Sequence, residues 1–236
     1  MKQITLLTVS TILLTTTLAT CQIEQKGDAW RKKAFNWIYD NKHWAQKEGV
    51  PLSGPGSTVE ATHTLRTLLP SIIKAVNANS VLDAGCGDFT WMQETKIIVK
   101  KYIGVDIAQG AIRENNKKYS SAKNSFYCLD ITKDPLPKVD LILCRDCLAH
   151  LSYEDLTAAI RNFKKSGSTY LLASTYPKLK INNVDIKSGD FRGVNLRAYP
   201  FNLPLPVMEF EELSAETDMK RWGKHMGLWR IEDIEI

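Results

Sequence analysis

Two glycines flank a cysteine directly after a short apolar run and an aspartate in VLDAGCGDF, residues 81–89. Glycines in such a turn let the backbone approach a bound ligand closely, at the edge of a sheet where ligands bind. A phosphate loop is poorly supported, because the pattern G-x-x-x-x-G-K-[ST] is absent. A dinucleotide fingerprint would need a third glycine at the position of Thr90. The turn therefore predicts a ligand site that is neither of these.

Acidic residues follow the next two apolar runs. GVDI ends near Asp106, and CLDIT contains Asp130 and Ile131. Because ligands bind at the carboxyl ends of strands in an open parallel sheet, we expect these carboxylates to lie beside the glycine turn. An aspartate after a strand is also an ordinary helix N-cap, and this alternative remains open for both residues.

A third polar cluster lies in LCRDCLAHLS, where Asp146 and His150 are four residues apart. A helical turn would place an acid and an imidazole on one face, where they could position or deprotonate a substrate group. The alternative is that Asp146 caps the turn and His150 only packs. Cys144 and Cys147 form a single C-x-x-C without a second pair or a spaced histidine pair, so we predict no metal site and expect buried structural thiols here and at Cys86 and Cys128.

The elements that must position these residues alternate between strands and helices. Apolar strands are predicted at 80–84, 101–106, 125–130, 139–144, 168–175 and 225–236, and helices at 109–119 and 153–166. Such alternation indicates an α/β fold with a mostly parallel sheet covered on both faces.

Two segments lie before the first strand. Residues 27–49 fit an amphipathic helix whose aromatic residues, among them Trp37, are expected in the core or its cover. Residues 51–57 form a Gly/Pro/Ser loop, either a linker or a lid, and a helix capped by Thr58 is expected to be interrupted or to end near Pro70.

Length and composition indicate one globular domain, since 236 residues with 44% hydrophobic and 24% charged residues can bury one sizeable core. The net charge of +5 comes from scattered lysine pairs, which favours solvated helix ends over a nucleic-acid surface.

Residues 1–22 have the composition of a secretory leader, with Lys2 followed by an apolar, threonine-rich run. The run is short for a permanent membrane span, so a cleaved signal peptide is favoured. Leu18 to Cys21 also resembles a lipoprotein lipobox, although Thr20 is unusual there. We therefore predict a leader at 1–22, a domain at 23–236, and a membrane or secretory location.

Taken in order, VLDAGCGDF, GVDI and CLDIT resemble the first three strand-end motifs of class I S-adenosylmethionine-dependent methyltransferases. LCRDCLAHLSYED, FNWIYDNKHW, SGPGST and FRGVNLRAYPF resemble further segments of small bacterial members, so the resemblance covers nearly all of the chain after the leader. It implies a Rossmann-like, mostly parallel seven-stranded sheet flanked by helices, with an N-terminal helical cover and an antiparallel C-terminal strand.

The resemblance also implies how S-adenosylmethionine would bind. Asp106 would accept the ribose hydroxyls, Asp83 would bond to the amino group of the methionine tail, and Arg66 would pair with its carboxylate. The backbone of the glycine turn would contact the tail, while residues after the second and third strands would meet the adenine. The implied cofactor-binding residues are Asp83, Gly85, Cys86, Gly87, Asp106, Ile107, Asp130, Ile131, Arg145 and Arg66.

Two functions remain open at this point. The first is methyl transfer to a small-molecule acceptor, with Asp146 and His150 as catalytic residues and residues 181–212 building the acceptor pocket. The second is a non-catalytic S-adenosylmethionine-binding or regulatory module of the same fold. Nucleic acid is not expected as a partner, because the N-P-P-[YF] signature is absent after the fourth strand. Membrane association through the N-terminus conflicts with a cofactor made inside cells, so a cytoplasmic location is the alternative.

Overall fold

The computed structural model describes residues 27–182, 184–212 and 223–236. The predicted leader at 1–22 lies outside the described residues. Within the described ranges, no helix has the length and apolar character needed to cross a membrane.

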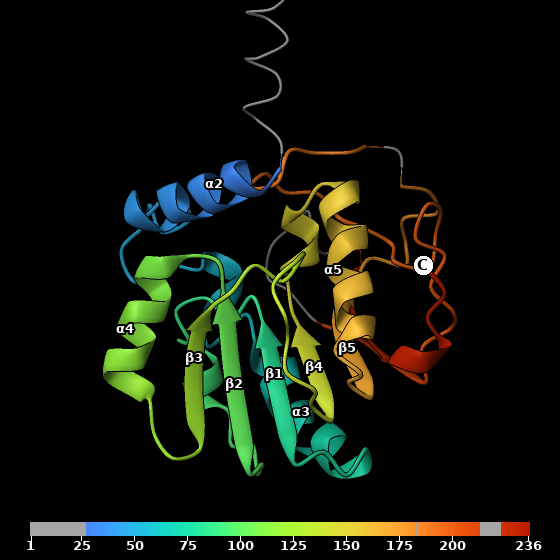
Figure 1. Cartoon of the computed structure of the whole chain (residues 1–236), viewed down its shortest axis with the longest axis horizontal. Coiled ribbons are helices and arrows are strands. Elements are labelled where there is room, and N and C mark those ends of the chain that lie inside the picture. The colour runs from blue at the N-terminus through green and yellow to red at the C-terminus, as the bar shows by residue number, and fades with distance from the viewer. Residues whose placement is uncertain (1–26, 183, 213–222) are drawn as a thin grey trace, which may run out of the picture.

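The described strands form one seven-stranded sheet with the order β3-β2-β1-β4-β5-β7-β6 (Figure 1). The first five strands pair in parallel, whereas β7 is antiparallel to both β5 and β6. The bounds are β1 Ser80–Ala84, β2 Lys101–Asp106, β3 Asn124–Cys128, β4 Leu141–Cys144, β5 Tyr170–Thr175, β6 Met208–Glu211 and β7 His225–Arg230. The predicted Rossmann-like sheet with an antiparallel C-terminal strand is confirmed.

Helices cover both faces of the sheet, and α2 lies across the carboxyl ends of the strands (Figure 1). The helix bounds are α2 Asp28–Asp40, α3 His63–Ala75, α4 Gln109–Tyr119 and α5 Tyr153–Lys165. Along β4, Ile142 and Cys144 pack in the layer that contains α5, while Leu141 and Leu143 pack in the layer that contains α3. This alternation is what a strand buried on both faces requires.

Helix α5 begins where the sequence supplies a cap. The Ser152 hydroxyl accepts a hydrogen bond from the Asp155 N–H at 3.2 Å, acidic residues occupy the first turn, and Lys164 and Lys165 occupy the last. The serine cap satisfies a free N–H at the start of the helix, and the acidic first turn and basic last turn complement the helix dipole. The cap fixes the position of Asp155, which takes part in the contacts that hold α2 over the sheet.

The first helix differs from the prediction in length and in one aromatic residue. It ends at Asp40, because Asn41 caps the Trp37 carbonyl through both its backbone and its side chain and Lys42 has a φ of 50°. Trp37 is 53% exposed, so its predicted place in the core or cover is wrong. Phe35 is buried on the opposite side of the same helix.

Two other local expectations are corrected. Helix α3 starts at His63 and continues through Pro70, because the flanking Leu69 and Ile72 are buried and their packing offsets the hydrogen bond that proline cannot donate. Cys128 is exposed, unlike Cys86 and Cys144, because β3 is an edge strand with one accessible side.

Candidate active site

The glycine turn after β1 has a backbone that only glycine adopts easily. Gly85 and Gly87 have φ values of 87° and 56°. A Cβ atom would lie 2.7 Å from Cys147 Sγ at the first position and 2.1 Å from Ser53 Oγ at the second. The first contact brings the segment after β4 against the turn, and the second brings the 51–57 loop against it. The turn is therefore a closely packed cradle, as the sequence predicts.

Asp106 ends β2 and lies beside this turn. Its carboxylate oxygens accept hydrogen bonds from the backbone N–H of Gly87 at 3.0 Å and of Ala108 at 2.9 Å. Burial raises the pKa of Asp106, and these backbone donors oppose that effect. Because each carboxylate oxygen accepts two hydrogen bonds, Asp106 keeps acceptor capacity for two ligand hydroxyls.

Asp83 is a second buried acid at the same place. The Tyr102 hydroxyl donates a hydrogen bond of 2.6 Å to Asp83 Oδ2. Burial nevertheless raises the pKa of Asp83 to about 7. A cationic group bound nearby would stabilise the ionised form of Asp83 and lower this pKa.

A cavity of about 310 Å³ opens at the carboxyl ends of β1, β2 and β4, beneath α2 and the 51–57 loop. Its size is that of a small-ligand site. The predicted site residues that line it are Asp83, Gly85, Cys86, Gly87, Asp106, Ile107, Asp130, Ile131, Arg145, Asp146 and His150. The Cys86 side chain packs in the apolar layer that contains α3, so this residue offers its backbone to the cavity.

Arg66 is the one predicted site residue that does not line this cavity. Its guanidinium donates hydrogen bonds to the Val59 carbonyl at 2.9 Å and to Thr62 Oγ1 at 3.3 Å. Both partners belong to the segment just before α3, in which Thr62 is the N-cap. The predicted pairing of Arg66 with the methionine carboxylate is therefore corrected.

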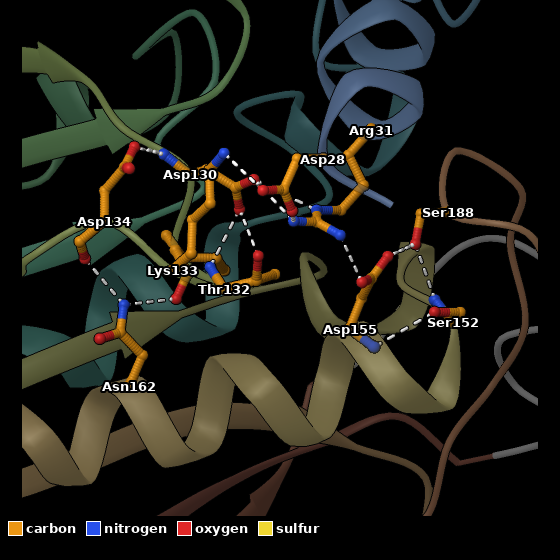
Figure 2. A network of polar contacts seen from close by, with 11 residues as sticks. Asp28, Arg31, Asp130, Thr132, Lys133, Asp134, Ser152, Asp155, Asn162 and Ser188 are labelled. Carbon is orange, nitrogen blue, oxygen red and sulfur yellow. Dashed lines mark hydrogen bonds and ion pairs between the residues drawn. The ribbon is translucent and has the colours of Figure 1, made fainter. Parts of the chain in front are cut away.

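Asp130 lines the cavity, but its carboxylate is already engaged (Figure 2). Oδ2 accepts from Arg31 Nε and Nη2 at 3.2 and 2.9 Å, and Oδ1 accepts from the Thr132 N–H and hydroxyl at 3.0 and 2.7 Å. Four hydrogen bonds use the acceptor capacity of this carboxylate. The expectation that it meets the adenine edge is corrected, because it anchors Arg31 instead.

Arg31 connects three parts of the chain (Figure 2). Besides Asp130, it pairs with Asp28 on its own helix and with Asp155 on α5, both at 2.5 Å. Asp155 also accepts a hydrogen bond of 2.5 Å from the Ser188 hydroxyl in the 181–212 segment. The side chains of Arg31, Asp130 and Asp155 are 5%, 7% and 13% exposed, so the two pairs between them hold α2 over the cavity with little competition from solvent, whereas Asp28 is exposed.

Sequence reasoning missed Arg31, although a signal was present. Arg31, Phe35 and Ile38 recur at helical spacing, and all three are buried. A single basic residue on an otherwise apolar helical face predicts a buried cation that needs acidic partners.

Asp146 belongs to a ring of four charged side chains. Arg145 Nη1 lies 3.2 Å from Asp146 Oδ2, and Arg145 Nε donates to Glu212 Oε1 at 2.7 Å. Lys224 Nζ pairs with Asp146 Oδ2 and lies 3.1 Å from Glu212 Oε2. Burial alone would raise the pKa of Asp146, but Lys224 and Arg145 hold it well below its usual range. Asp146 is therefore ionised at every physiological pH.

His150 lies at the same end of the cavity. Its Nδ1 is 2.8 Å from the Asp190 carbonyl, which only accepts, so Nδ1 carries the proton and Nε2 keeps a lone pair. The ring packs between Trp44 and Phe191, with centroids 4.7 and 5.2 Å away. Burial lowers the pKa of His150, which keeps the imidazole neutral.

The helical turn predicted for Asp146 and His150 is not formed. Asp146 has a φ of 51°, in the left-handed region, and the 3-10 helix η3 spans only Leu148–His150. Both residues still reach one cavity, because the backbone reverses after β4.

Comparison with known proteins agrees with this geometry. Residues 81–168 match a family model described as a methyltransferase domain, while no curated protein matches in sequence. N-methyltransferase NodS from Bradyrhizobium japonicum WM9, in complex with S-adenosylhomocysteine, has a TM-score of 0.60 at 16% identity, over 82% of this chain and 97% of that chain. Magnesium protoporphyrin IX methyltransferase ChlM from Synechocystis PCC 6803, with bound S-adenosylmethionine, gives 0.54 at 17% identity, over 84% and 94% of the two chains.

The described sheet thus has the Rossmann-like fold of these solved methyltransferases. The methyltransferase-domain match over residues 81–168 and the shared fold agree with the predicted resemblance to class I S-adenosylmethionine-dependent methyltransferases.

Proposed function

We propose that this chain transfers a methyl group from S-adenosylmethionine to a small-molecule acceptor. The observation that carries the proposal is Asp106, fixed by two backbone N–H groups beside a glycine cradle, with acceptor capacity left for a diol. The buried acids Asp83 and Asp106 at one end of the cavity and the ionised Asp146 at the other end support the same conclusion.

The residues around the turn have distinct roles in this proposal. Bound S-adenosylmethionine supplies a methyl group that its sulfonium already activates. Asp106 binds the ribose hydroxyls, the backbone of Gly85 and Gly87 contacts the methionine tail, and Asp83 receives the amino group. Asp83 fits a cationic group because its pKa of about 7 allows it to ionise on binding.

Asp146 and His150 serve the acceptor. Asp146 positions a donor group through its carboxylate, and His150 takes the proton that the acceptor loses, through the lone pair on Nε2. Alignment supplies much of the rate in such an in-line displacement. A module that only binds the cofactor has no use for a neutral imidazole at this position, so we favour the enzyme over the regulatory alternative.

The size of the cavity favours a small acceptor over a macromolecule. Residues 181–212 were expected to build the acceptor pocket. Of the described residues in this segment, Phe191 alone lines the cavity. The other role of this segment is to carry the Asp190 carbonyl that orients His150.

Replacing His150 with Asn should lower turnover at least tenfold while the affinity for adenosylhomocysteine changes less than twofold. Because burial lowers the pKa of His150, the wild-type rate should be constant above neutral pH and fall only below pH 6.5, as Nε2 becomes protonated. The acceptor is first obtained by screening metabolite pools with labelled cofactor, and turnover is then measured from pH 5 to 8.

The exposed His43 provides the matched control, since His43→Asn should leave both measurements unchanged. A His150→Asn variant that melts several degrees lower, while its folded fraction keeps full activity, would show that His150 is structural.

We also propose that residues 1–22 direct the protein to a membrane or secretory route. Their uncharged run after Lys2 supports this, whereas cofactor supply favours the cytoplasm. A C-terminally tagged full chain should fractionate with membranes or the exported pool, in a processed form. A soluble cytoplasmic protein that retains these residues contradicts the proposal.

A further inference from the structure

Tyr102 is a buried tyrosine whose hydroxyl contacts a residue of the candidate cofactor site. It lies on β2, is 1% exposed and does not line the cavity. Its hydroxyl donates a hydrogen bond of 2.6 Å to Asp83 Oδ2. This length is typical of a hydroxyl that donates to an ionised carboxylate. Tyr102 can therefore act on a ligand in the cavity only through another residue, and Asp83 is that residue.

The position of the hydroxyl follows from the pairing of β1 with β2. Val81 is paired with Tyr102 and Asp83 with Gly104, so Tyr102 and Asp83 lie diagonally across the ladder. Side chains two residues apart on a strand share a face, and here that face is the one that α3 covers. Gly104, directly beside Asp83, has no side chain that would compete for the carboxylate.

The ring of Tyr102 is held by apolar neighbours. Its centroid lies 5.2 Å from that of Phe89 and 6.0 Å from that of Phe126. The hydroxyl adds nothing to this packing, and a buried hydroxyl without a polar partner costs free energy. Its contribution therefore lies in the contact with Asp83.

Asp83 is subject to opposing effects on its ionisation. Burial and the nearby Asp106 carboxylate raise the pKa of Asp83 to about 7, whereas the Tyr102 hydroxyl and the Arg145 guanidinium act to lower it. Burial also raises the pKa of Tyr102 well above its usual value, so the hydroxyl keeps its proton and remains a donor at physiological pH. The hydroxyl thus favours the carboxylate form of Asp83.

Two thiols complete the surroundings of Asp83. The charged and titratable groups that face it, among the described residues, are Tyr102, Asp106, Arg145, Cys86 and Cys147. Burial raises the pKa of Cys86, and a contact with the Cys144 thiol, together with burial, raises that of Cys147. Neither thiol therefore changes the charge near Asp83 at neutral pH.

We propose that Tyr102 is a positioning residue for cofactor binding: its hydroxyl holds Asp83 Oδ2 and favours the carboxylate form, which leaves Oδ1 for the ammonium group of the methionine tail. The inference rests on the proposed function, in which Asp83 receives this group. Without the hydroxyl, more of Asp83 would be protonated near neutral pH. The affinity for the tail would then fall, while the contacts with the adenosine part would not change.

Two ligands separate the tail from the rest of the cofactor. Adenosylhomocysteine carries the amino-acid tail, whereas 5′-methylthioadenosine has the same adenosine and a thioether without it. Calorimetry with the full chain gives both affinities from pH 6 to 8, and their ratio reports the tail. Because Asp83 ionises as the pH rises through about 7, the wild-type preference for adenosylhomocysteine should rise at least threefold over this range.

Tyr102→Phe should weaken the binding of adenosylhomocysteine at pH 7 at least fivefold and move the rise in preference to higher pH. A hydrogen bond to a charged group typically changes an equilibrium by about tenfold or more. The affinity for methylthioadenosine should stay within twofold of wild type. Tyr119→Phe is the matched control, because Tyr119 packs on Phe89 at 5.1 Å in the same aromatic layer, and it should behave as wild type.

Asp83→Asn shows whether Tyr102 acts through the carboxylate. This variant should lose the pH dependence of the preference, and adding Tyr102→Phe to it should cause no further change. If Tyr102→Phe has the same effect in the Asn variant, or weakens both ligands equally, the hydroxyl serves the fold alone and the proposal is overturned.

The wild-type measurement decides the proposal even if a variant does not fold. A preference that stays constant from pH 6 to 8, with both ligands bound, would overturn the role of the Tyr102–Asp83 pair and leave the cofactor site intact. Wild-type protein that binds neither ligand would instead contradict the proposed function.

Discussion

Replacing Asp106 with Ala should weaken the binding of adenosylhomocysteine at least tenfold. Hydrogen bonds to a charged carboxylate contribute about 1.5–3 kcal/mol each, and 1.4 kcal/mol corresponds to a factor of ten in affinity. Asp106 has both oxygens fixed by backbone donors, so the ribose hydroxyls would find their acceptors already oriented. Calorimetry with the protein lacking residues 1–22 measures the change.

Alanine also leaves the N–H groups of Gly87 and Ala108 without their partner, so the glycine turn could shift. Asp106→Asn separates the two effects, because it keeps one acceptor oxygen while removing the charge. It should lose most of the affinity with a smaller fall in melting temperature. The exposed Asp233 provides the control, and unchanged affinity in both Asp106 variants would refute the assigned role.

Arg31→Met should lower the free energy of unfolding by about 3 kcal/mol, since removing one partner of a buried ion pair typically costs 3–5 kcal/mol. The substitution leaves the carboxylates of Asp130 and Asp155 buried without their cation. Methionine retains the volume of the aliphatic part of the side chain, so the loss reports the charge rather than a cavity. Urea unfolding measures it.

Two controls make this result specific. Arg161 on the exposed side of α5 should tolerate Met within about 0.5 kcal/mol. A triple variant, Arg31→Met with Asp130→Asn and Asp155→Asn, should recover much of the lost stability, because neutral amides are less costly to bury than unpaired carboxylates. Equal stability of Arg31→Met and wild type would mean that α2 is held by its apolar side chains alone.

The sheet and the cofactor end of the cavity could be predicted because their signals are local. A short apolar run followed by glycine or aspartate determines where a strand ends, and strand ends of a parallel sheet meet at one edge. Asp83, Gly87 and Asp106 therefore came together as predicted. Asp130 followed the same rule, but its role differs because Arg31 binds its carboxylate from a helix 99 residues earlier.

The acceptor end could not be predicted in the same way. Glu212 and Lys224 reach the ring around Asp146 only because β7 runs antiparallel to β5, and no spacing in the sequence pairs residues 67 and 78 positions apart. The positive φ of Asp146 was equally hidden, because left-handed backbone at a non-glycine residue depends on tertiary contacts. Arg66 is the opposite case, because the sequence predicted a contact with the ligand, whereas its side chain donates to the nearby Val59 carbonyl.

The two ends of the cavity are completed at different times during synthesis, because the charge ring needs a residue near the C-terminus. The segment that matches the methyltransferase model ends at residue 168, whereas Asp146 receives its last partner only when Lys224 has been made. At ribosomal rates of 5–20 residues per second, the interval is roughly 3–11 s. During this time Asp146 has Arg145 beside it but lacks Lys224, so the C-terminal strands β6 and β7 complete the charge ring at the proposed acceptor end.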